Sequence, residues 1–216
     1  MPEALRDKAT SLTTSDGVHL SALELGEGPD GVLLDHEQGY SICSFLDIGQ
    51  ELASRGYHVM IPEYRNHGAS EEVPEDNEHI ARDARAALAE LKRLGAERVF
   101  VGGASCGGTT AAIVGAERTV PVVGLLIMSS PARCGGDGVA AVKTIDTPSL
   151  FVVSPGDMNG AVEKQVRELY AASAAKDKKL VIDPSGFHGT SMIHESPQGA
   201  ALKDRVIRFV EAVYAR

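Results

Sequence analysis

One serine in this chain has flanking residues that suit nucleophilic chemistry. Ser105 lies in the segment GASCG at 103–107, directly after the apolar run 99–101 and before small residues that suit a helix. The pattern G-x-S-x-G is typical of a nucleophile elbow, a sharp strand-to-helix turn in which the glycines remove side chains that would clash. The free N–H groups at the helix start can bind an oxyanion. We therefore predict that Ser105 is an acyl-accepting nucleophile.

An acid and a base follow two later apolar runs. Asp157 comes after the run 150–153, and His188 comes after the run 180–182. A serine hydroxyl is a weak nucleophile at neutral pH, so it needs a histidine that takes its proton and a carboxylate that orients the imidazole. The order Ser105, Asp157, His188 along the chain is the order found with this type of elbow. We predict that these three residues are the catalytic residues.

Four other side chains compete for these roles. His194 lies six residues beyond His188, Asp183 directly follows the run before the histidine, and Glu163 suits the first turn of a helix. Cys106 is a more reactive nucleophile than serine, but its elbow would place Ala104 where the first glycine is expected. We favour Ser105, Asp157 and His188 and keep the others as alternatives.

Short apolar runs alternate with helical patterns along the chain. The runs lie at 32–34, 59–61, 99–101, 124–128, 150–153 and 180–182. Apolar positions with helical spacing lie at 45–52, 80–94, 162–170 and 202–213. This alternation predicts an α/β fold with a doubly wound, mainly parallel sheet and helices on both faces. The segment Ser11 to Leu25, with a turn at 15–17, predicts an antiparallel N-terminal hairpin.

The predicted sheet explains how distant residues meet. In such a sheet, ligands bind beyond the carboxyl ends of the strands. Ser105, Asp157 and His188 each follow an apolar run, so we expect them to converge at one edge.

From about Leu12 to Tyr214 the chain resembles the α/β-hydrolase superfamily. Besides the elbow, the segment PEYRNHGAS at 62–70 is similar to the family's P-D-x-R-G-H-G-x-S loop, with Glu63 and Asn66 departing from that pattern. The resemblance implies one α/β-hydrolase-like domain over residues 1–216. We expect His67 to form hydrogen bonds within this loop and to take no part in catalysis.

The resemblance also implies an oxyanion hole made by two main-chain N–H groups. The family commonly has His-Gly after the strand that corresponds to 32–34, whereas this chain reads DHEQGY at 35–40. We expect Cys106 and Gln38 to supply the two donors, with Glu37 as the alternative to Gln38. A carboxylate facing the oxyanion would oppose its charge, so we expect the Glu37 side chain to point away.

The predicted substrate site is shallow. Residues 129–149, where the superfamily often inserts a lid, are enough for a loop and one short helix, so we expect no large cap. Four apolar side chains near the strand ends are candidates for contact with substrate: Tyr40, Met158, Phe187 and Met192.

Composition narrows the class of protein. The 216 residues carry a formal net charge of −9 without a dense basic run, which argues against a nucleic-acid surface. The first eight residues lack the apolar core of a signal peptide, and the apolar run 122–128 is too short to span a bilayer. These features favour a cytoplasmic protein with no membrane span.

The chain has an odd number of cysteines, and they lack metal-ligand spacing: Cys43, Cys106 and Cys134. We therefore expect reduced thiols, with neither a disulfide nor a zinc site.

Together, these patterns predict a serine hydrolase that cleaves a small carboxylic ester or a related acyl compound through an acyl-enzyme. No metal or organic cofactor is expected, and the expected partner is a small-molecule acyl substrate. A lyase of the hydroxynitrile type with the same triad and a non-hydrolytic binding protein of this fold are the alternatives. The sequence specifies neither the acyl and alcohol groups nor the oligomeric state.

Overall fold

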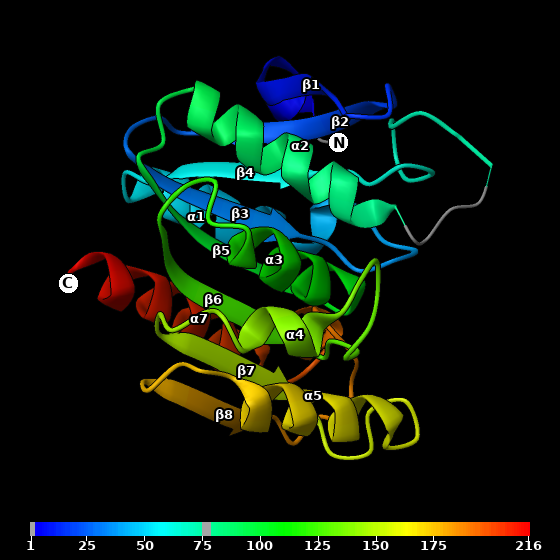
Figure 1. Cartoon of the computed structure of the whole chain (residues 1–216), viewed down its shortest axis with the longest axis vertical. Coiled ribbons are helices and arrows are strands. Elements are labelled where there is room, and N and C mark those ends of the chain that lie inside the picture. Colours follow the sequence, from blue (N-terminus) through cyan, green and yellow to red (C-terminus); the bar gives the residue numbers. More distant parts are fainter. Residues whose placement is uncertain (1–2, 75–78) are drawn as a thin grey trace.

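The computed structural model describes residues 3–74 and 79–216, and within these residues eight strands form one mixed sheet (Figure 1). The strands are β1 (Ala9–Thr13), β2 (His19–Leu25), β3 (Asp30–Asp35), β4 (His58–Pro62), β5 (Arg98–Ala104), β6 (Val122–Met128), β7 (Ser149–Val153) and β8 (Lys178–Ile182). Their order across the sheet is β1-β2-β4-β3-β5-β6-β7-β8.

The pairing confirms the predicted sheet. Strand β2 pairs antiparallel with both β1 and β4, while β3 to β8 pair in parallel. Strand β3 lies between β4 and β5, so the strand order reverses at β3. At such a switch point the loops that follow neighbouring strands diverge and leave a crevice at the carboxyl edge of the sheet. The loops after β3 and β5 are therefore the ones that border this crevice.

Helices cover both faces of the sheet. They are α1 (Leu46–Ser54), α2 (Ile80–Arg93), α3 (Cys106–Ala116), α4 (Gly138–Val142), α5 (Ala161–Ala172), α6 (Ser191–His194) and α7 (Gly199–Tyr214), with short 3-10 helices at Glu3–Lys8 and Ile42–Ser44. In Figure 1, α2, α3, α4 and α5 lie in front of the sheet, and α1 and α7 lie behind it. The long helices confirm the predicted periodicity, whereas the four-residue α6 is too short to produce a periodic signal.

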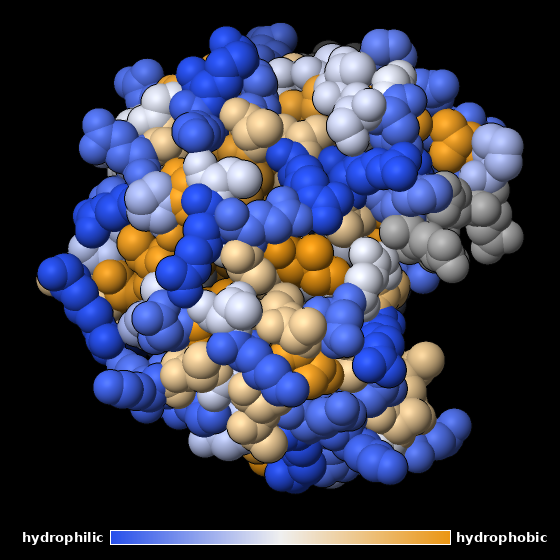
Figure 2. All heavy atoms as spheres, viewed as in Figure 1, coloured by the Kyte–Doolittle hydropathy of each residue, from blue (hydrophilic) through white to orange (hydrophobic). Residues whose placement is uncertain are grey.

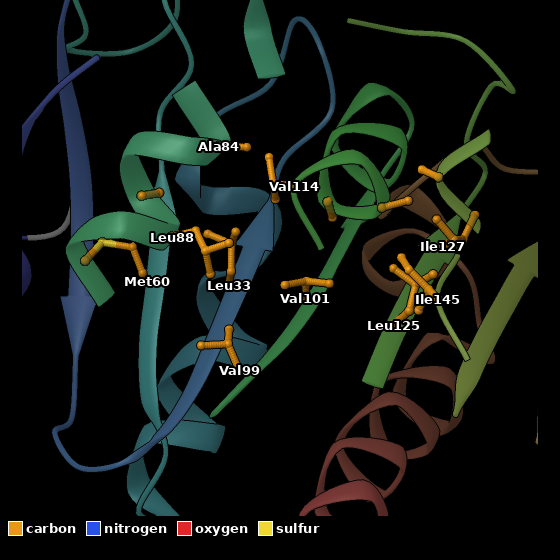
Figure 3. Close-up of a cluster of buried hydrophobic side chains, with 14 of the residues drawn as sticks. Leu33, Met60, Ala84, Leu88, Val99, Val101, Val114, Leu125, Ile127 and Ile145 are labelled. Atoms are coloured by element: carbon orange, nitrogen blue, oxygen red, sulfur yellow. The ribbon is translucent and has the colours of Figure 1, made fainter. Parts of the chain in front are cut away.

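Two hydrophobic clusters make up the core, one on each face. The first joins the sheet to the helices in front of it, and Figure 3 shows part of this cluster, with Leu33 of β3 and Leu88 of α2 among its members. The second joins the other face to α1 and α7, through residues such as Phe100 and Val206. Because both faces are covered, the central strands β3 to β7 are almost completely buried.

Close approach of backbones brings the start of α3 against the end of β3. A Cβ atom on Gly107 would lie 2.1 Å from the carbonyl oxygen of Asp35, so a side chain cannot be accommodated there. This contact places the loop after β3 beside the N-terminus of α3.

Residues 129–148, between β6 and β7, hold the short helix α4. In Figure 2 the visible face is hollowed at the edge toward which β7 points in Figure 1. Among the described residues, no helix is long and apolar enough to cross a membrane.

Candidate active site

Ser105 occupies the tip of the turn between β5 and α3. Its backbone has φ 51° and ψ −128°, a conformation that a residue with a side chain adopts at a cost. A Cβ atom on Gly103 would lie 2.4 Å from the carbonyl carbon of Gly107, so the strand and helix approach as closely as the predicted elbow requires. The N–H group of Ser105 donates to the carbonyl of Met128 at 2.8 Å, which fixes the turn against β6.

His188 and Asp157 form a hydrogen-bonded pair at the same edge of the sheet. Asp157 follows β7 and is 1% exposed, while His188 follows β8 with its side chain 29% exposed. The Nδ1 atom of His188 lies 2.8 Å from Oδ1 of Asp157. A proton on Nδ1 directed at the carboxylate leaves Nε2 as the basic nitrogen, which is the tautomer that a general base needs.

The rival acids and the rival base have other partners. His194 donates from Nε2 to the carbonyl of Ser44 at 2.8 Å. Asp183 accepts from the N–H group of Ser185 at 3.0 Å, within its own loop. Glu163 accepts from the N–H group of Gly156 at 2.9 Å, and this bond together with Arg167 lowers its pKa. Each rival therefore holds local structure together.

The loop after β3, residues 36–40, is fixed by two histidines. His36 donates from Nδ1 to the carbonyl of Glu37 at 2.6 Å, and its Nε2 accepts from the N–H group of Tyr64 at 3.1 Å. Burial lowers the pKa of His36 to about 4, so its imidazole stays neutral at pH 7. His67 accepts at Nε2 from the N–H group of Gly39 and donates from Nδ1 to the carbonyl of Arg65, both at 2.8 Å. The expected hydrogen bonding of His67 within its own loop is thus confirmed, and a second bond connects it to the loop 36–40.

Glu37 connects this loop to the loop that carries His188. The side chain is 2% exposed, and Oε1 accepts from both the N–H group and the hydroxyl of Thr190, the latter at 2.6 Å. Gly189, with φ +56°, leaves room for the carboxylate, since a Cβ atom there would lie 2.4 Å from Oε1. The Glu37 carboxylate is thus engaged by the histidine loop. No local sequence pattern indicated this contact, because the two partners are 153 residues apart.

Buried ionisable side chains lie beneath the site. Asp35, at the end of β3, is completely buried, and burial raises its pKa well above the usual range, with Asp83 adding to the shift. Arg65 is 3% exposed and binds Asp83 at 2.7 Å and Asp16 at 3.0 Å. The Arg65 guanidinium lowers the pKa of Asp16. These ion pairs join the β1–β2 turn and the loop 62–70 to α2.

The structure corrects the prediction that all three cysteines are reduced. Cys106 and Cys134 form a disulfide with their Cα atoms 5.3 Å apart, and Cys43 is free and exposed. A sulfur held in a disulfide cannot act as the nucleophile, so the Cys106 alternative does not apply to this form. The two bonded cysteines are 28 residues apart, and this spacing gave no indication of a disulfide. They meet because the loop after β6 folds back to Cys106.

Two hollows flank the loop 36–40. One, of about 390 Å³, is lined in part by Gln38, Gly39 and His67. The other, of about 300 Å³, is lined in part by Tyr40 and Thr190.

The four predicted lining residues have different surroundings. Tyr40 is 50% exposed at the second hollow, Met158 is 61% exposed, and Phe187 is half-buried. Met192, by contrast, is fully buried in the core cluster behind the sheet, so the lining role predicted for it does not fit. The side chain points inward because the short helix α6 packs against that core. Among the described residues, no group of three or more His, Cys, Asp or Glu side chains could hold a metal ion.

Solved structures with this fold include several esterases. The chain is similar to the Pyrococcus furiosus esterase Pf2001, with 20% identity, a TM-score of 0.77 and coverage of 95% of this chain and 91% of that one. It is also similar to the esterase EaEST from Exiguobacterium antarcticum, with 13% identity, a TM-score of 0.74 and coverage of 94% and 99%. A Paleococcus ferrophilus monoacylglycerol lipase gives 16% identity, a TM-score of 0.75 and coverage of 90% and 99%.

No curated protein sequence matches the chain. The sequence model of the alpha/beta hydrolase fold matches residues 37–181, about two thirds of the chain, from the loop after β3 to the end of β8. The chain therefore belongs to the α/β-hydrolase fold family.

Proposed function

We propose that this protein is a serine hydrolase that cleaves small carboxylic esters through an acyl-enzyme. The observation that carries the proposal is the hydrogen-bonded pair His188 and Asp157, which follows β8 and β7 at the sheet edge where the backbone of Ser105 is held at a positive φ. An activated serine needs this combination of a nucleophile at an elbow, a base, and an acid that orients the base.

Ser105, His188 and Asp157 have distinct roles in the proposed reaction. Nε2 of His188 takes the proton of Ser105 Oγ as the oxygen attacks the carbonyl carbon of the ester. His188 then gives the proton to the departing alcohol, and the acyl group stays on Ser105. Water, deprotonated by His188, attacks the acyl carbon, the bond between that carbon and Ser105 Oγ breaks, and His188 returns the proton to Ser105 Oγ as the acid is released. Asp157, buried beside Nδ1, holds the imidazole in the required tautomer and stabilises the imidazolium.

The oxyanion hole is the second part of the proposal. The main-chain N–H groups of Cys106, at the first position of α3, and of Gln38, in the loop after β3, are the proposed donors. Two observations support them. The end of β3 lies against the start of α3, and Oε1 of Glu37 accepts hydrogen bonds from Thr190, so this carboxylate oxygen is held by the loop that carries His188. Donors at these positions would stabilise the charge that develops on the carbonyl oxygen.

The surroundings favour a small acyl group. The hollows beside the loop 36–40 measure about 390 and 300 Å³, and α4 is the one helix described between β6 and β7. Such a site offers little apolar surface to a long chain. The similar solved structures are those of esterases and a monoacylglycerol lipase, which supports ester chemistry in general terms. We also propose that the chain acts as one domain without a large cap, because both core clusters share one sheet.

Active-site labelling tests the nucleophile. A fluorophosphonate probe followed by peptide mapping should modify Ser105 in the wild-type protein and leave the Ser105→Ala variant unmodified. A folded wild-type protein that neither reacts with the probe nor hydrolyses any ester would contradict the proposal and favour a binding protein. Release of an aldehyde or ketone from a cyanohydrin, without an acyl-enzyme, would favour the lyase.

Chain length tests the size of the site. Across p-nitrophenyl esters, kcat/KM should be highest for acyl groups of roughly two to six carbons. A steady rise of kcat/KM to long fatty acyl chains would show that the site holds a groove the two hollows do not account for.

A further inference from the structure

Three segments meet at the sulfur of Cys106. Cys106 directly follows Ser105 and is 7% exposed. Its Sγ atom is bonded to Cys134 in the loop after β6, and it lies 3.8 Å from Oε1 of Gln38 in the loop after β3. The disulfide therefore includes one residue of the proposed oxyanion hole, Cys106, and contacts the other, Gln38. It also connects the elbow covalently to the loop after β6.

We propose that the Cys106–Cys134 disulfide is a site of thiol–disulfide exchange with a dithiol, and that its oxidation state sets the activity of the oxyanion hole. This inference rests on the proposed ester hydrolysis. The oxidised form is the more active one, because the disulfide holds Cys106 and the loop beside it in place.

The surroundings direct the attack to the sulfur of Cys134. Cys134 is half-buried, whereas Cys106 is almost completely buried. Gly135 and Gly136 directly follow Cys134 and have no side chains of their own that could cover its sulfur. Attack at Cys134 expels Cys106 as a thiolate at the first position of the eleven-residue helix α3, where the free N–H groups and the helix dipole stabilise negative charge. A stabilised leaving thiolate speeds the exchange.

The exchange needs one dithiol and releases two protein thiols. The first thiolate of the dithiol bonds to Sγ of Cys134 while the Cys106–Cys134 bond breaks, and Cys106 takes the electron pair and then a proton. The second thiolate of the dithiol then displaces Cys134, which is also protonated. The dithiol loses two electrons and becomes a disulfide, and the protein disulfide gains those two electrons.

Reduction changes the contact with Gln38. A disulfide sulfur carries no hydrogen and cannot donate, whereas a Cys106 thiol can donate to Oε1 of Gln38, which already lies 3.8 Å away. A hydrogen bond formed there would shift Gln38 relative to Cys106 and so move one oxyanion donor. At the same time the loop that carries Cys134 loses its covalent bond to the elbow. Both changes act on the transition state more than on substrate binding.

The rest of the loop stays anchored when the disulfide is broken. The hydroxyl of Thr109 donates to the carbonyl of Pro131 at 2.6 Å, and the N–H group of Ala132 donates to Gln165 at 2.9 Å. The N–H group of Gly138 donates to the carbonyl of Ala132 at 3.0 Å. These bonds hold both ends of the segment, so the reduced protein keeps its fold.

Kinetics at controlled redox poise test the inference. Wild-type protein is equilibrated with defined ratios of reduced to oxidised dithiothreitol, and kcat and KM for p-nitrophenyl acetate are measured alongside thiol content by maleimide modification and peptide mapping. We expect one modifiable thiol, Cys43, in the oxidised protein and three in the reduced protein. On reduction kcat should fall at least about fivefold with KM within about twofold, and oxidation should restore it. Near-ultraviolet circular dichroism should show that the fold is kept.

Variants separate this site from other effects of the reductant. Cys134→Ala should have the low kcat of the reduced wild type and should not respond to dithiothreitol. Cys43→Ser should show the same fold-change between its own oxidised and reduced forms as the wild type.

The inference would be overturned by reduced protein whose kcat stays within twofold of the oxidised value, or by Cys134→Ala with full kcat. Loss of the fold on reduction would also overturn it, since the disulfide would then serve stability alone. Failure of the proposed function looks different: the oxidised protein would hydrolyse no ester and resist the fluorophosphonate probe, whatever its thiol content.

Discussion

Glu37 accepts hydrogen bonds from both the main-chain N–H group and the hydroxyl of Thr190, although 153 residues separate the two in the chain. Glu37 belongs to the loop after β3, next to the proposed oxyanion donor Gln38, and Thr190 lies two residues after His188. One buried carboxylate thus ties the proposed oxyanion hole to the proposed general base. We expect the relative position of these two parts of the proposed reaction centre to depend on this contact.

Removing the Glu37 carboxylate should lower activity, because the two loops that it connects would lose their relative position. We expect Glu37→Ala to reduce kcat about tenfold with KM within about threefold, because the carboxylate binds a loop and not the substrate. The free energy of unfolding should fall by about 2 to 3 kcal/mol, since both the N–H group and the hydroxyl of Thr190 lose a buried carboxylate acceptor.

A double-mutant cycle tests the contact directly. Glu37→Ala and Thr190→Val, studied singly and together by urea unfolding, should show a coupling energy of about 1 to 2 kcal/mol. Additive effects, or an unchanged kcat in Glu37→Ala, would show that the contact does not position the site.

The backbone conformation of Ser105 predicts how substitutions at this position change stability and activity. Because φ is 51° and ψ is −128°, Ser105→Gly should be more stable than Ser105→Ala by about 1 kcal/mol, as glycine adopts this conformation without a Cβ clash. Both variants should lose ester turnover by at least about 10⁴-fold, because the covalent step needs the hydroxyl. Thermal unfolding and initial rates measure the two effects. Turnover above a tenth of the wild-type value in either variant would exclude Ser105 as the nucleophile.

Asp157→Asn should leave the fold intact and lower kcat roughly 10³- to 10⁴-fold. The NH2 group of asparagine can donate to Nδ1 of His188, whereas the carboxylate only accepts, so the imidazole can adopt the wrong tautomer. Asp183→Asn and Glu163→Gln are matched controls, because each removes one negative charge from a neighbouring loop or helix start, and each should stay within about threefold of the wild type. A large loss in either control, with Asp157→Asn fully active, would reassign the acid.

The elements and the pairing of His188 with Asp157 were predictable from the sequence for a physical reason. Buried parallel strands produce short apolar runs, and the residues after those runs meet at one edge of the sheet whatever their separation along the chain. Asp157 and His188 could therefore be paired without knowing the conformation of either loop.

Contacts that depend on loop conformation could not be predicted in this way. The bond of Cys134 to Cys106 requires the loop after β6 to fold back over α3, and nothing in the spacing of the cysteines indicates that path. The bonds of Glu37 to Thr190 likewise depend on the positive φ of Gly189. Met192 was misplaced because it lies in α6, whose four residues are too few to reveal which face is buried.

His36 predicts how stability changes with pH. Burial lowers its pKa in the folded protein to about 4, below the usual value of 6.5, so the unfolded chain binds the proton more tightly. Stability from this group is therefore complete above pH 6.5 and is lost as the pH falls through about 4, by about 3 kcal/mol in all. In His36→Gln, whose amide oxygen can still accept from the N–H group of Tyr64, this part of the pH dependence should vanish. Asp16 does not affect the comparison between pH 7.5 and pH 4.5. Its pKa is lowered, so its contribution to stability is lost only below about 3.8.

Urea unfolding at pH 7.5 and at pH 4.5 measures the change in the free energy of unfolding. His19 is an exposed histidine, so His19→Gln is the control that should keep the wild-type dependence of stability on pH. If His36→Gln loses as much stability on acidification as the wild type, the buried imidazole is not the group that destabilises the protein at low pH.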